Sequence, residues 1–180
     1  MTNGEPVQPR NNKKAGFTLI ELMVVLAVAI IIASVGIPSM YRLIADNRLA
    51  TYTNELVADI NLARSEAIKR SQRVIFCKVA CNEDADWNAG WVVFEDIDND
   101  NVVDPNEVIR LHESLSNTVD IDLNIAGNRL VYNARGLLDN GAMSTFTISD
   151  NNDEANSRRI VISMTGRART EIVYDTPSES

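Results

Sequence analysis

One segment constrains this sequence more than any other: residues 17–37 form an apolar run of 21 residues that contains a single charged side chain, Glu21. As a helix, a run of this length extends roughly 30 Å, which is enough to cross the hydrocarbon core of a bilayer. Residues 1–12 show no apolar periodicity, and Lys13 and Lys14 then precede the run. Because positive charge is retained on the cytoplasmic side, we expect one membrane span with the C-terminus outside.

The remainder of the chain has the size of one modest globular domain. The whole sequence has 180 residues and a formal net charge of −8. Residues 72–175 are polar and numerous enough to bury a core, so we assign them to a domain beyond the membrane, and we assign 176–180 to a flexible tail. An acidic chain of this kind is not a general nucleic-acid binder, so any such binding requires a local basic site.

The residues around the start of the apolar run are more specific than a generic signal anchor. They read Ala15-Gly16-Phe17-Thr18-Leu19-Ile20-Glu21-Leu22. This segment resembles the N-terminal signal of type IV prepilins. The resemblance implies that a prepilin peptidase cleaves between Gly16 and Phe17, that residues 1–16 are a leader, and that Phe17 becomes methylated. It also implies that Glu21 pairs with the amino group of a neighbouring pilin during assembly. A lone carboxylate in hydrocarbon is costly and usually marks function.

The helix is expected to continue beyond the membrane. Residues 17–38 form the membrane and assembly segment, and Gly36 and Pro38 favour a kink or a locally unwound turn at its end. Residues 39–71 are predicted to form an amphipathic helix that ends near 69–71. Its apolar side chains recur at three- and four-residue spacing and include Leu49, Tyr52, Leu56, Ile60, Ala63 and Ala67. Charged and polar side chains fall largely off this stripe, among them Arg48, Asn54, Asp59, Arg64, Glu66 and Lys69.

The residues after the helix have the pattern of β-structure. Short apolar segments alternate with turns rich in Asn, Asp and Gly. The expected strands are 74–79, 90–95, 107–112, 119–123, 129–132, 144–148, 158–164 and 167–174. The predicted fold class is therefore α+β, with one long N-terminal helix packed on a C-terminal antiparallel sheet domain.

Three further motifs resemble minor pilins of the FimT/GspH family, and the FimT branch in particular. They are the helical segment 56–67 followed by Arg73-Val74, the segment Trp87-x-x-Gly90-Trp91-x-Val93-Phe94, and the late segment Gly166-Arg167-Ala168-Arg169. The resemblance implies the type IV pilin fold, inner-membrane anchoring with a periplasmic domain, assembly into a pilus, and other pilins as partners.

The arginine segment is the principal candidate for binding. Gly166 permits a positive φ in a turn, and Arg167 and Arg169 are then expected to face the same way, roughly 6–7 Å apart, which is close to the phosphate spacing of a nucleic-acid strand. Arg158 and Arg159 are expected on the partner strand of the same hairpin. In the FimT branch this motif is associated with DNA binding, so the resemblance implies binding of double-stranded DNA during natural transformation. Two to four arginines make few phosphate contacts, so we expect this binding to be weak and non-specific. A hairpin with solvated surface arginines is the alternative.

Two other groups of residues predict structural features. Cys77 and Cys81 are expected to pair outside the cytoplasm, which requires a tight turn between them because four extended residues span about 13 Å. The acidic segment 96–107 has the spacing of an EF-hand loop. Its candidate Ca²⁺ ligands are Asp96, Asp98, Asp100, Asp104 and Glu107. Asn101 stands where such loops usually have glycine, and a solvated acidic turn is the alternative.

Catalysis is not expected. Trp87 and Trp91 are interpreted as buried anchors of the sheet, and His112 has no accompanying nucleophile motif. No phosphate-binding loop occurs in the sequence, and no cofactor other than Ca²⁺ is implied. The alternatives to a DNA-binding minor pilin are a purely structural minor pilin that supports pilus assembly and a GspH-like minor pseudopilin of a type II secretion system.

Overall fold

The computed structural model describes residues 17–81, 85–116, 118–125, 128–139, 141, 143–151 and 153–174. The chain divides into two compact units, Met1–Arg42 and Leu43–Ser180. The predicted leader, residues 1–16, and the predicted tail, residues 176–180, lie outside the described residues.

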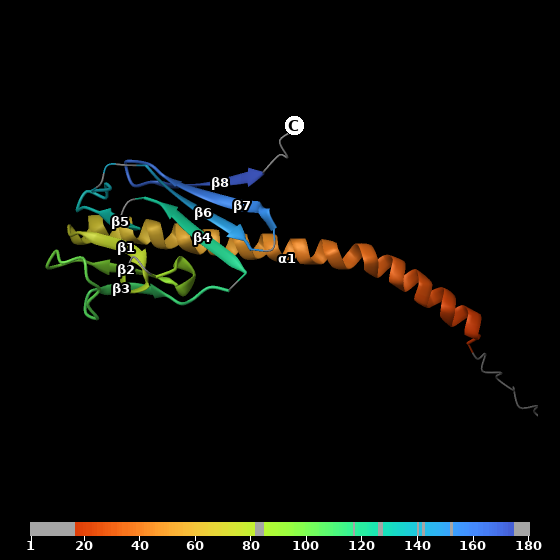
Figure 1. The fold of residues 1–180 in the computed structure, drawn as a ribbon. Helices are drawn as coiled ribbons and strands as arrows, with labels where there is room; N and C mark the ends of the chain where they lie inside the picture. The colour runs from red at the N-terminus through yellow and green to blue at the C-terminus, as the bar shows by residue number, and fades with distance from the viewer. Residues whose placement is uncertain are drawn as a thin grey trace, which may run out of the picture. The chain divides into compact units, whose positions relative to one another are not determined.

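A single helix, α1 (Leu19–Arg70), supplies the described part of the first unit and the first element of the second (Figure 1). It begins with an N-cap, because the Thr18 hydroxyl accepts a hydrogen bond from the Glu21 backbone N–H at 3.3 Å. It continues across Gly36 and Pro38, so the locally unwound turn that the sequence suggested there does not form. A proline costs the helix one hydrogen bond, but its φ is compatible with helical geometry.

The C-terminal end of α1 is closed by a Schellman motif. The Gln72 N–H donates to the Ala67 carbonyl at 3.2 Å, and the Ser71 N–H donates to the Ile68 carbonyl at 3.3 Å. Ser71 has a φ of 55°, so a serine occupies the left-handed position that glycine usually fills. The helix therefore stops at Arg70, inside the range that the sequence indicated, and the chain turns into the first strand.

Two antiparallel sheets follow the helix. The first has the order β3-β2-β1-β5, with β1 (Val74–Lys78), β2 (Trp91–Glu95), β3 (Val108–His112) and β5 (Arg129–Tyr132). The short 3₁₀ helices Val79–Cys81 and Trp87–Ala89 connect β1 to β2. The second has the order β4-β6-β7-β8, with β4 (Val119–Asn124), β6 (Ser144–Asp150), β7 (Asp153–Ile162) and β8 (Ala168–Tyr174).

All eight strands lie within or overlap the predicted segments, and the α+β fold class is confirmed. The largest difference is β7, which begins at Asp153 rather than near residue 158. Its first residues are polar, so the apolar pattern that identified the other strands is missing there. Pairing explains the extension, because β7 hydrogen-bonds to β6 on one side and to β8 on the other.

The main core lies between the second half of α1 and the inner faces of both sheets. The apolar stripe of the helix is buried as predicted, and Leu49, Leu56 and Ile60 are fully inaccessible. Trp87 and Trp91 are also buried, which confirms their assignment as anchors. A second apolar cluster lies on the other face of the first sheet and comprises Ile75, Cys77, Val92 and Phe94, against which Cys81, Val103 and Val131 pack.

Two charged side chains of α1 belong to this buried face, although the sequence placed them largely off the apolar stripe. Asp59 is 1% exposed, and its carboxylate accepts hydrogen bonds from Trp91 Nε1 at 2.8 Å and from Arg110 Nη1 at 3.0 Å. Glu66 is also largely buried and pairs with Lys69 and Arg70. Both carboxylates are satisfied by donors from their surroundings, which is what makes their burial tolerable.

Candidate nucleic-acid interface

The β7–β8 hairpin turns through a three-residue loop, residues 164–166. The Gly166 N–H donates to the Ser163 carbonyl at 2.8 Å, and the Ser163 N–H donates to the Arg167 carbonyl at 3.0 Å. Gly166 has a φ of 76°. This combination of a tight turn with a left-handed glycine is the common three-residue hairpin, and it directs the chain straight from Gly166 into the arginine-bearing strand.

The turn is packed against the domain at Gly166. The Tyr132 hydroxyl donates to the Gly166 carbonyl at 3.3 Å, and Arg64 Nε donates to the carbonyl of neighbouring Gly136 at 3.0 Å. Burial raises the pKa of Tyr132 far above its usual value of about 10, so the hydroxyl keeps its proton and remains a donor. A Cβ atom added to Gly166 would lie 2.6 Å from the Gly136 carbonyl oxygen. The hairpin turn is therefore packed against Tyr132 of β5 and against Gly136, whose carbonyl is held by Arg64 of α1.

Arg167 and Arg169 follow this turn and are both exposed. They are two residues apart in an extended chain, so their side chains point to the same side. Arg169 is opposite Val161 in the register, and its side chain is 70% exposed. Its Nη2 forms an ion pair with Glu171 Oε1 at 2.6 Å, an exposed contact that is worth less than about 1 kcal/mol. One acidic side chain thus partly neutralises the pair of arginines.

Arg159 and Arg158 occupy opposite faces of β7. Arg159 is exposed and lies opposite Glu171 in the register, on the same face as Val161 and Arg169. Arg158 lies on the same face as the buried residues Ile160 and Ile162. It is half-buried, and its buried Nε has no hydrogen-bond partner among the described residues. The structure therefore places Arg159 on the same face as Arg169 and turns Arg158 toward the core side.

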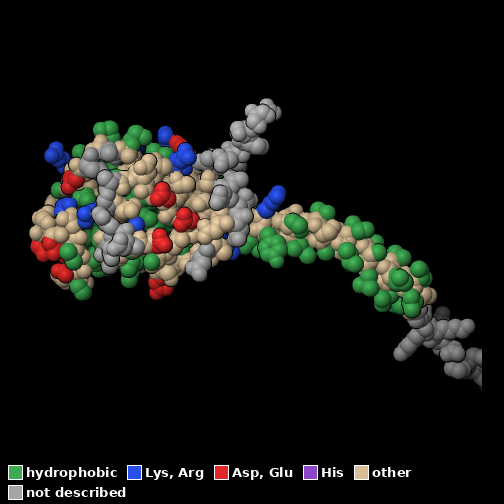
Figure 2. All heavy atoms as spheres, in the orientation of Figure 1, with side chains coloured by type: hydrophobic (Ala, Val, Ile, Leu, Met, Phe, Trp, Pro, Cys, Tyr) green, Lys and Arg blue, Asp and Glu red, His purple; other side chains and the backbone are tan. Residues whose placement is uncertain are grey.

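The outer face of the second sheet carries an acidic side chain beyond Arg159. Arg159 lies opposite Thr147, which in turn lies opposite Asp122 of β4. These residues line a shallow hollow of about 510 Å³ together with Leu123, Asn124, Ile125 and Thr145. In Figure 2 the acidic and basic side chains of the visible face are interspersed rather than separated into two patches. The hairpin end, with Arg167 and Arg169, is thus the basic edge of a mixed surface.

Two arginines that were not among the sequence candidates lie beside the hairpin. Arg64 reaches the Gly136 carbonyl, which directly abuts Gly166, and Arg135 is an exposed neighbour of Gly136. Gly136 itself has a φ of 72°, so the turn 133–136 resembles the turn at Gly166. The pairing of two glycine turns requires the tertiary structure, because roughly thirty residues separate them in sequence.

Comparison with known families decides the assignment. The model of a family described as type II transport protein GspH matches residues 52–166, which is more than half of the chain. The chain belongs to the GspH family. A second model, the prokaryotic N-terminal methylation motif, matches residues 11–37, the segment that contains Gly16, Phe17 and Glu21.

Solved structures of similar fold are also pilins and pseudopilins. The type IV minor pilin FimU of Pseudomonas aeruginosa has 25% identity and a TM-score of 0.56, over 69% of this chain and 89% of that chain. The minor pseudopilin EpsH of the Vibrio cholerae type II secretion system has 12% identity and a TM-score of 0.52, over 73% of this chain and 99% of that chain; this second likeness concerns the fold alone. Comparison with curated protein sequences finds no match.

This GspH-family protein is therefore a minor pilin or pseudopilin, a membrane-anchored filament subunit whose partners are other pilins. Helix α1 is long and apolar enough, near its N-terminus, to cross a membrane by length and composition. Glu21 lies in its first turn, where the helix dipole favours a negative charge. Phe17 precedes the helix and is exposed, whereas Gly16, on the other side of the predicted cleavage point, lies outside the described residues.

The two cysteines of this GspH-family domain form the expected disulfide. Cys77 ends up 5.3 Å from Cys81 between Cα atoms, because residues Val79–Cys81 form one turn of 3₁₀ helix after β1. Cys81 has a φ of 50°, which closes this turn. The bridge lies on the second face of the first sheet, where Cys77 is buried with Ile75.

The acidic segment forms the connection from β2 to β3, distant in sequence from the hairpin. Carboxylate oxygens of Asp96, Asp98 and Asp100 all lie within 4.8 Å of one another. Glu107 is buried at the end of the same connection, and Asp104 is exposed. The structure therefore gathers three of the five candidate ligands, Asp96, Asp98 and Asp100. Asp104 contributes its backbone carbonyl to a turn, where it accepts the Glu107 N–H at 3.0 Å.

Proposed function

We propose that this GspH-family protein is a minor type IV pilin that binds double-stranded DNA non-specifically through its β7–β8 hairpin and so supports DNA uptake in natural transformation. The observation that carries the proposal is the anchored turn at Gly166, which presents Arg167 and Arg169 on one exposed edge. In an acidic chain, such a local basic edge is where a polyanion would bind.

We infer that the contacts are made to the DNA backbone rather than to the bases. Arginine offers a planar fork that matches phosphate oxygens, and side chains two residues apart on a strand are spaced like successive phosphates. Arg159 lies on the same face and extends the edge along β7, whereas the half-buried Arg158 is left out of the proposed surface. Contacts of this kind position a duplex without reading its sequence.

The proposed affinity is low. Three phosphate contacts would give a slope of log K against log salt of roughly −2 to −3. Non-specific binding of this type has a Kd of about 10⁻⁴ to 10⁻⁶ M, and the net charge of −8 favours the weak end of that range. Several copies in one filament would raise the effective affinity wherever their geometry lets them engage one duplex together.

The test is fluorescence anisotropy of a labelled duplex with full-length protein in detergent, at two salt concentrations. Arg167→Gln and Arg169→Gln are each expected to weaken binding several-fold, and the double variant to abolish it. Arg129→Gln is the matched control, since it removes one positive charge from β5, outside the hairpin. Equal binding by wild type and the double variant, or no binding by the wild type, would overturn the proposal.

A variant at Glu171 is expected to strengthen DNA binding, whereas the arginine variants weaken it. Its carboxylate holds Arg169 Nη2 at 2.6 Å and lies opposite Arg159 in the register. Glu171→Gln removes the competing charge from both arginines, so we expect tighter DNA binding than wild type, most visibly at low salt. Weaker binding by this variant would show that the ion pair positions Arg169 rather than competing with DNA.

A second candidate function is that of a minor pseudopilin in a type II secretion system, which the description of the matching family favours. A purely structural minor pilin is the third. Both would use the same helix and the same fold but not the hairpin arginines. Deletion followed by assays of protein export and of transformation separates them, because a pseudopilin affects export and the proposed pilin affects DNA uptake.

We further propose the membrane arrangement that prepilins share: a leader of residues 1–16 removed by a prepilin peptidase between Gly16 and Phe17, a single inner-membrane span, and a periplasmic C-terminal domain. The match of the methylation motif to residues 11–37 and the apolar first half of α1 support this arrangement. Glu21, whose backbone N–H donates to the Thr18 hydroxyl, is proposed to pair through its carboxylate with the amino group of the adjacent subunit.

A further inference from the structure

We propose that the loop between β2 and β3, residues 96–107, is a Ca²⁺-binding site. This inference is independent of the DNA proposal, because the loop contributes no residue to the hairpin. It rests on the distances between the loop's carboxylates, on one buried carboxylate oxygen without a hydrogen-bond partner, and on the balance of charge in the loop.

The carboxylates of the loop are close enough to share one ion. Asp96, Asp98 and Asp100 each offer an oxygen, and the three oxygens lie within 4.8 Å of one another. Ca²⁺ binds oxygens at about 2.3–2.6 Å, so two of its ligands are at most about 5 Å apart. A single Ca²⁺ among these oxygens can therefore contact all three with little movement of the chain.

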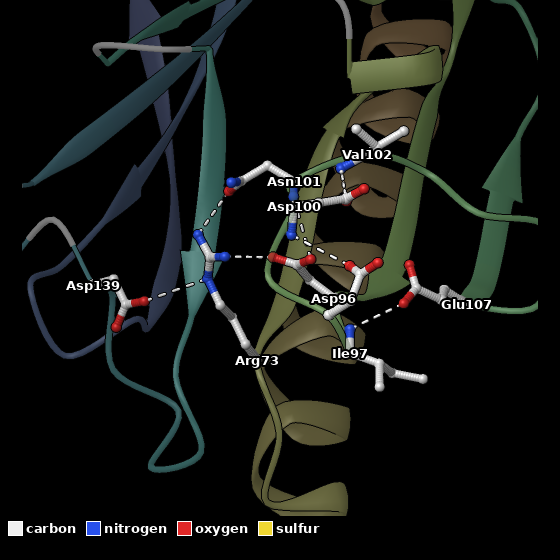
Figure 3. A network of polar contacts seen from close by, with 9 residues as sticks. Arg73, Asp96, Ile97, Asp100, Asn101, Val102, Glu107 and Asp139 are labelled. Carbon is white, nitrogen blue, oxygen red and sulfur yellow. Dashed lines mark hydrogen bonds and ion pairs between the residues drawn. The ribbon is translucent and has the colours of Figure 1, made fainter.

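Glu107 gives a second indication of a cation site. It is 5% exposed, and its Oε1 accepts a hydrogen bond from the Ile97 N–H at 3.0 Å. Its Oε2 is buried and has no hydrogen-bond partner among the described residues. In Figure 3 this carboxylate points toward the start of the loop, the side on which Asp96 lies. A buried carboxylate oxygen without a partner is costly, and a divalent cation would satisfy it.

The backbone of the loop follows the course that an EF-hand loop takes. Asn101, at the sixth position, has a φ of 62°, and its N–H donates to Asp96 Oδ1 at 3.3 Å. Asparagine tolerates this left-handed conformation, so the usual glycine is not needed. Glu107 falls at the twelfth position, where such loops supply a carboxylate with both oxygens on the ion. The loop lies between strands rather than helices, so only the ligand geometry is shared.

One positive side chain already enters the loop. Arg73 forms an ion pair with Asp96 Oδ2, donates to Asn101 Oδ1 at 2.7 Å, and lies 3.7 Å from Asp139 Oδ2 (Figure 3). It pairs with Asp96, whereas Asp98, Asp100 and Glu107 form no ion pair with a basic side chain of the described residues. The loop therefore retains an excess of negative charge next to a buried oxygen, which favours binding of a divalent ion.

Ion binding at this position would stabilise the domain. Val103, in the middle of the loop, packs on the cluster that contains Phe94 and the disulfide-bonded Cys77. A bound ion would restrict the motion of the loop and so keep Val103 packed on this apolar cluster. Sites that operate outside the cytoplasm typically bind Ca²⁺ with a Kd of about 10⁻⁴ to 10⁻³ M, and we expect this range here.

The test uses full-length protein in detergent after removal of divalent ions. Calcium chloride is titrated by calorimetry, and thermal unfolding is followed by tryptophan fluorescence, because both tryptophans belong to the β domain. We expect a Kd below about 1 mM and, at 5 mM calcium, an increase in Tm of roughly 3–8 °C. Equal concentrations of magnesium should give a smaller shift, because Mg²⁺ requires a tighter octahedral site.

Asp98→Asn is the diagnostic variant, because it removes an exposed ligand charge and keeps an oxygen that can accept the Asp100 N–H. It should lose at least tenfold in calcium affinity and most of the Tm shift. Asp122→Asn, which removes an exposed charge from β4, is the control and should respond as wild type does. No Tm shift at 5 mM calcium, or equal shifts in wild type and Asp98→Asn, would overturn the proposal.

Discussion

Replacing Gly166 by alanine tests whether the hairpin is anchored as described. Gly166 has a φ of 76°, and a left-handed residue with a Cβ costs about 1–2 kcal/mol. The added Cβ would also lie 2.6 Å from the Gly136 carbonyl oxygen and 2.7 Å from Tyr132 Cε1, and overpacking of this kind costs about 1–3 kcal/mol. We therefore expect Gly166→Ala to lower the free energy of unfolding by about 2–5 kcal/mol.

Gly141→Ala is the matched control, because Gly141 has a φ of 59° but no atom within 4 Å of an added Cβ. It should cost only the backbone term, about 1–2 kcal/mol. Urea unfolding followed by tryptophan fluorescence resolves the difference, since a typical slope of about 1–3 kcal/mol per molar converts it to roughly 1 M in the midpoint. Equal midpoints for the two variants would refute the packing of the hairpin turn against Gly136 and Tyr132.

Three other predictions follow from the structure and the motifs. Mass spectrometry of the protein from its native membrane should find methylated Phe17 at the N-terminus, and an intact leader from a peptidase-competent host would contradict the processing proposal. Asp59→Ala should destabilise the domain by about 2–4 kcal/mol in urea unfolding, because it leaves the buried Trp91 N–H without an acceptor and Arg110 without its partner. Hydrogen bonds from Arg70 and Lys69 lower the pKa of Glu66 from about 4.5, so the Tm advantage of wild type over Glu66→Gln should be constant above that pH and disappear as the pH falls through the lowered pKa.

The strands were predictable from the sequence where one face of the strand is buried and the other is exposed to solvent. In β4 and β6 buried and more exposed residues alternate without exception, so the period of two is visible in the sequence. In β1 all five residues are buried, and it was recognised from its apolar run instead. The start of β7 has neither signal: Asp153 is placed by its pairing with Asp150 of β6, and pairing with β8 begins only at Asn156.

The division into two four-stranded sheets was not predictable in the same way. It depends on which strands pair, and β5 joins β1 rather than its sequence neighbour β4. Polar contacts between distant residues could not be predicted either, because they also depend on which strands pair. Asp59 looked like a solvated helix residue, because nothing local shows that Trp91 Nε1 and Arg110 approach it from strands 32 and 51 residues away.

Part of the arginine site was predictable from the spacing of the Gly-Arg-x-Arg motif. The turn at Gly166 and the exposure of Arg167 and Arg169 agree with what a Gly-Arg-x-Arg segment predicts at the end of a hairpin. Which of Arg158 and Arg159 faces the core depends on the register of β7, because a shift of one residue would exchange their faces. In the observed register Arg158 shares the face of the buried Ile160. The neighbouring Gly136 turn, with Arg135, became visible only in the folded domain.

A comparison in cells separates filament assembly from DNA binding. Glu21 is proposed to pair with the amino group of the adjacent subunit, so Glu21→Ala is expected to block incorporation into filaments and, with it, any activity that depends on filaments. The double variant at Arg167 and Arg169 changes only exposed side chains beyond the turn, so it should enter filaments in normal amounts. If the hairpin binds DNA, this variant alone combines normal incorporation with a loss of DNA uptake of at least tenfold. Normal uptake by the double variant would instead assign the arginines to contacts within the filament or to no function, and would leave assembly as the role of the protein.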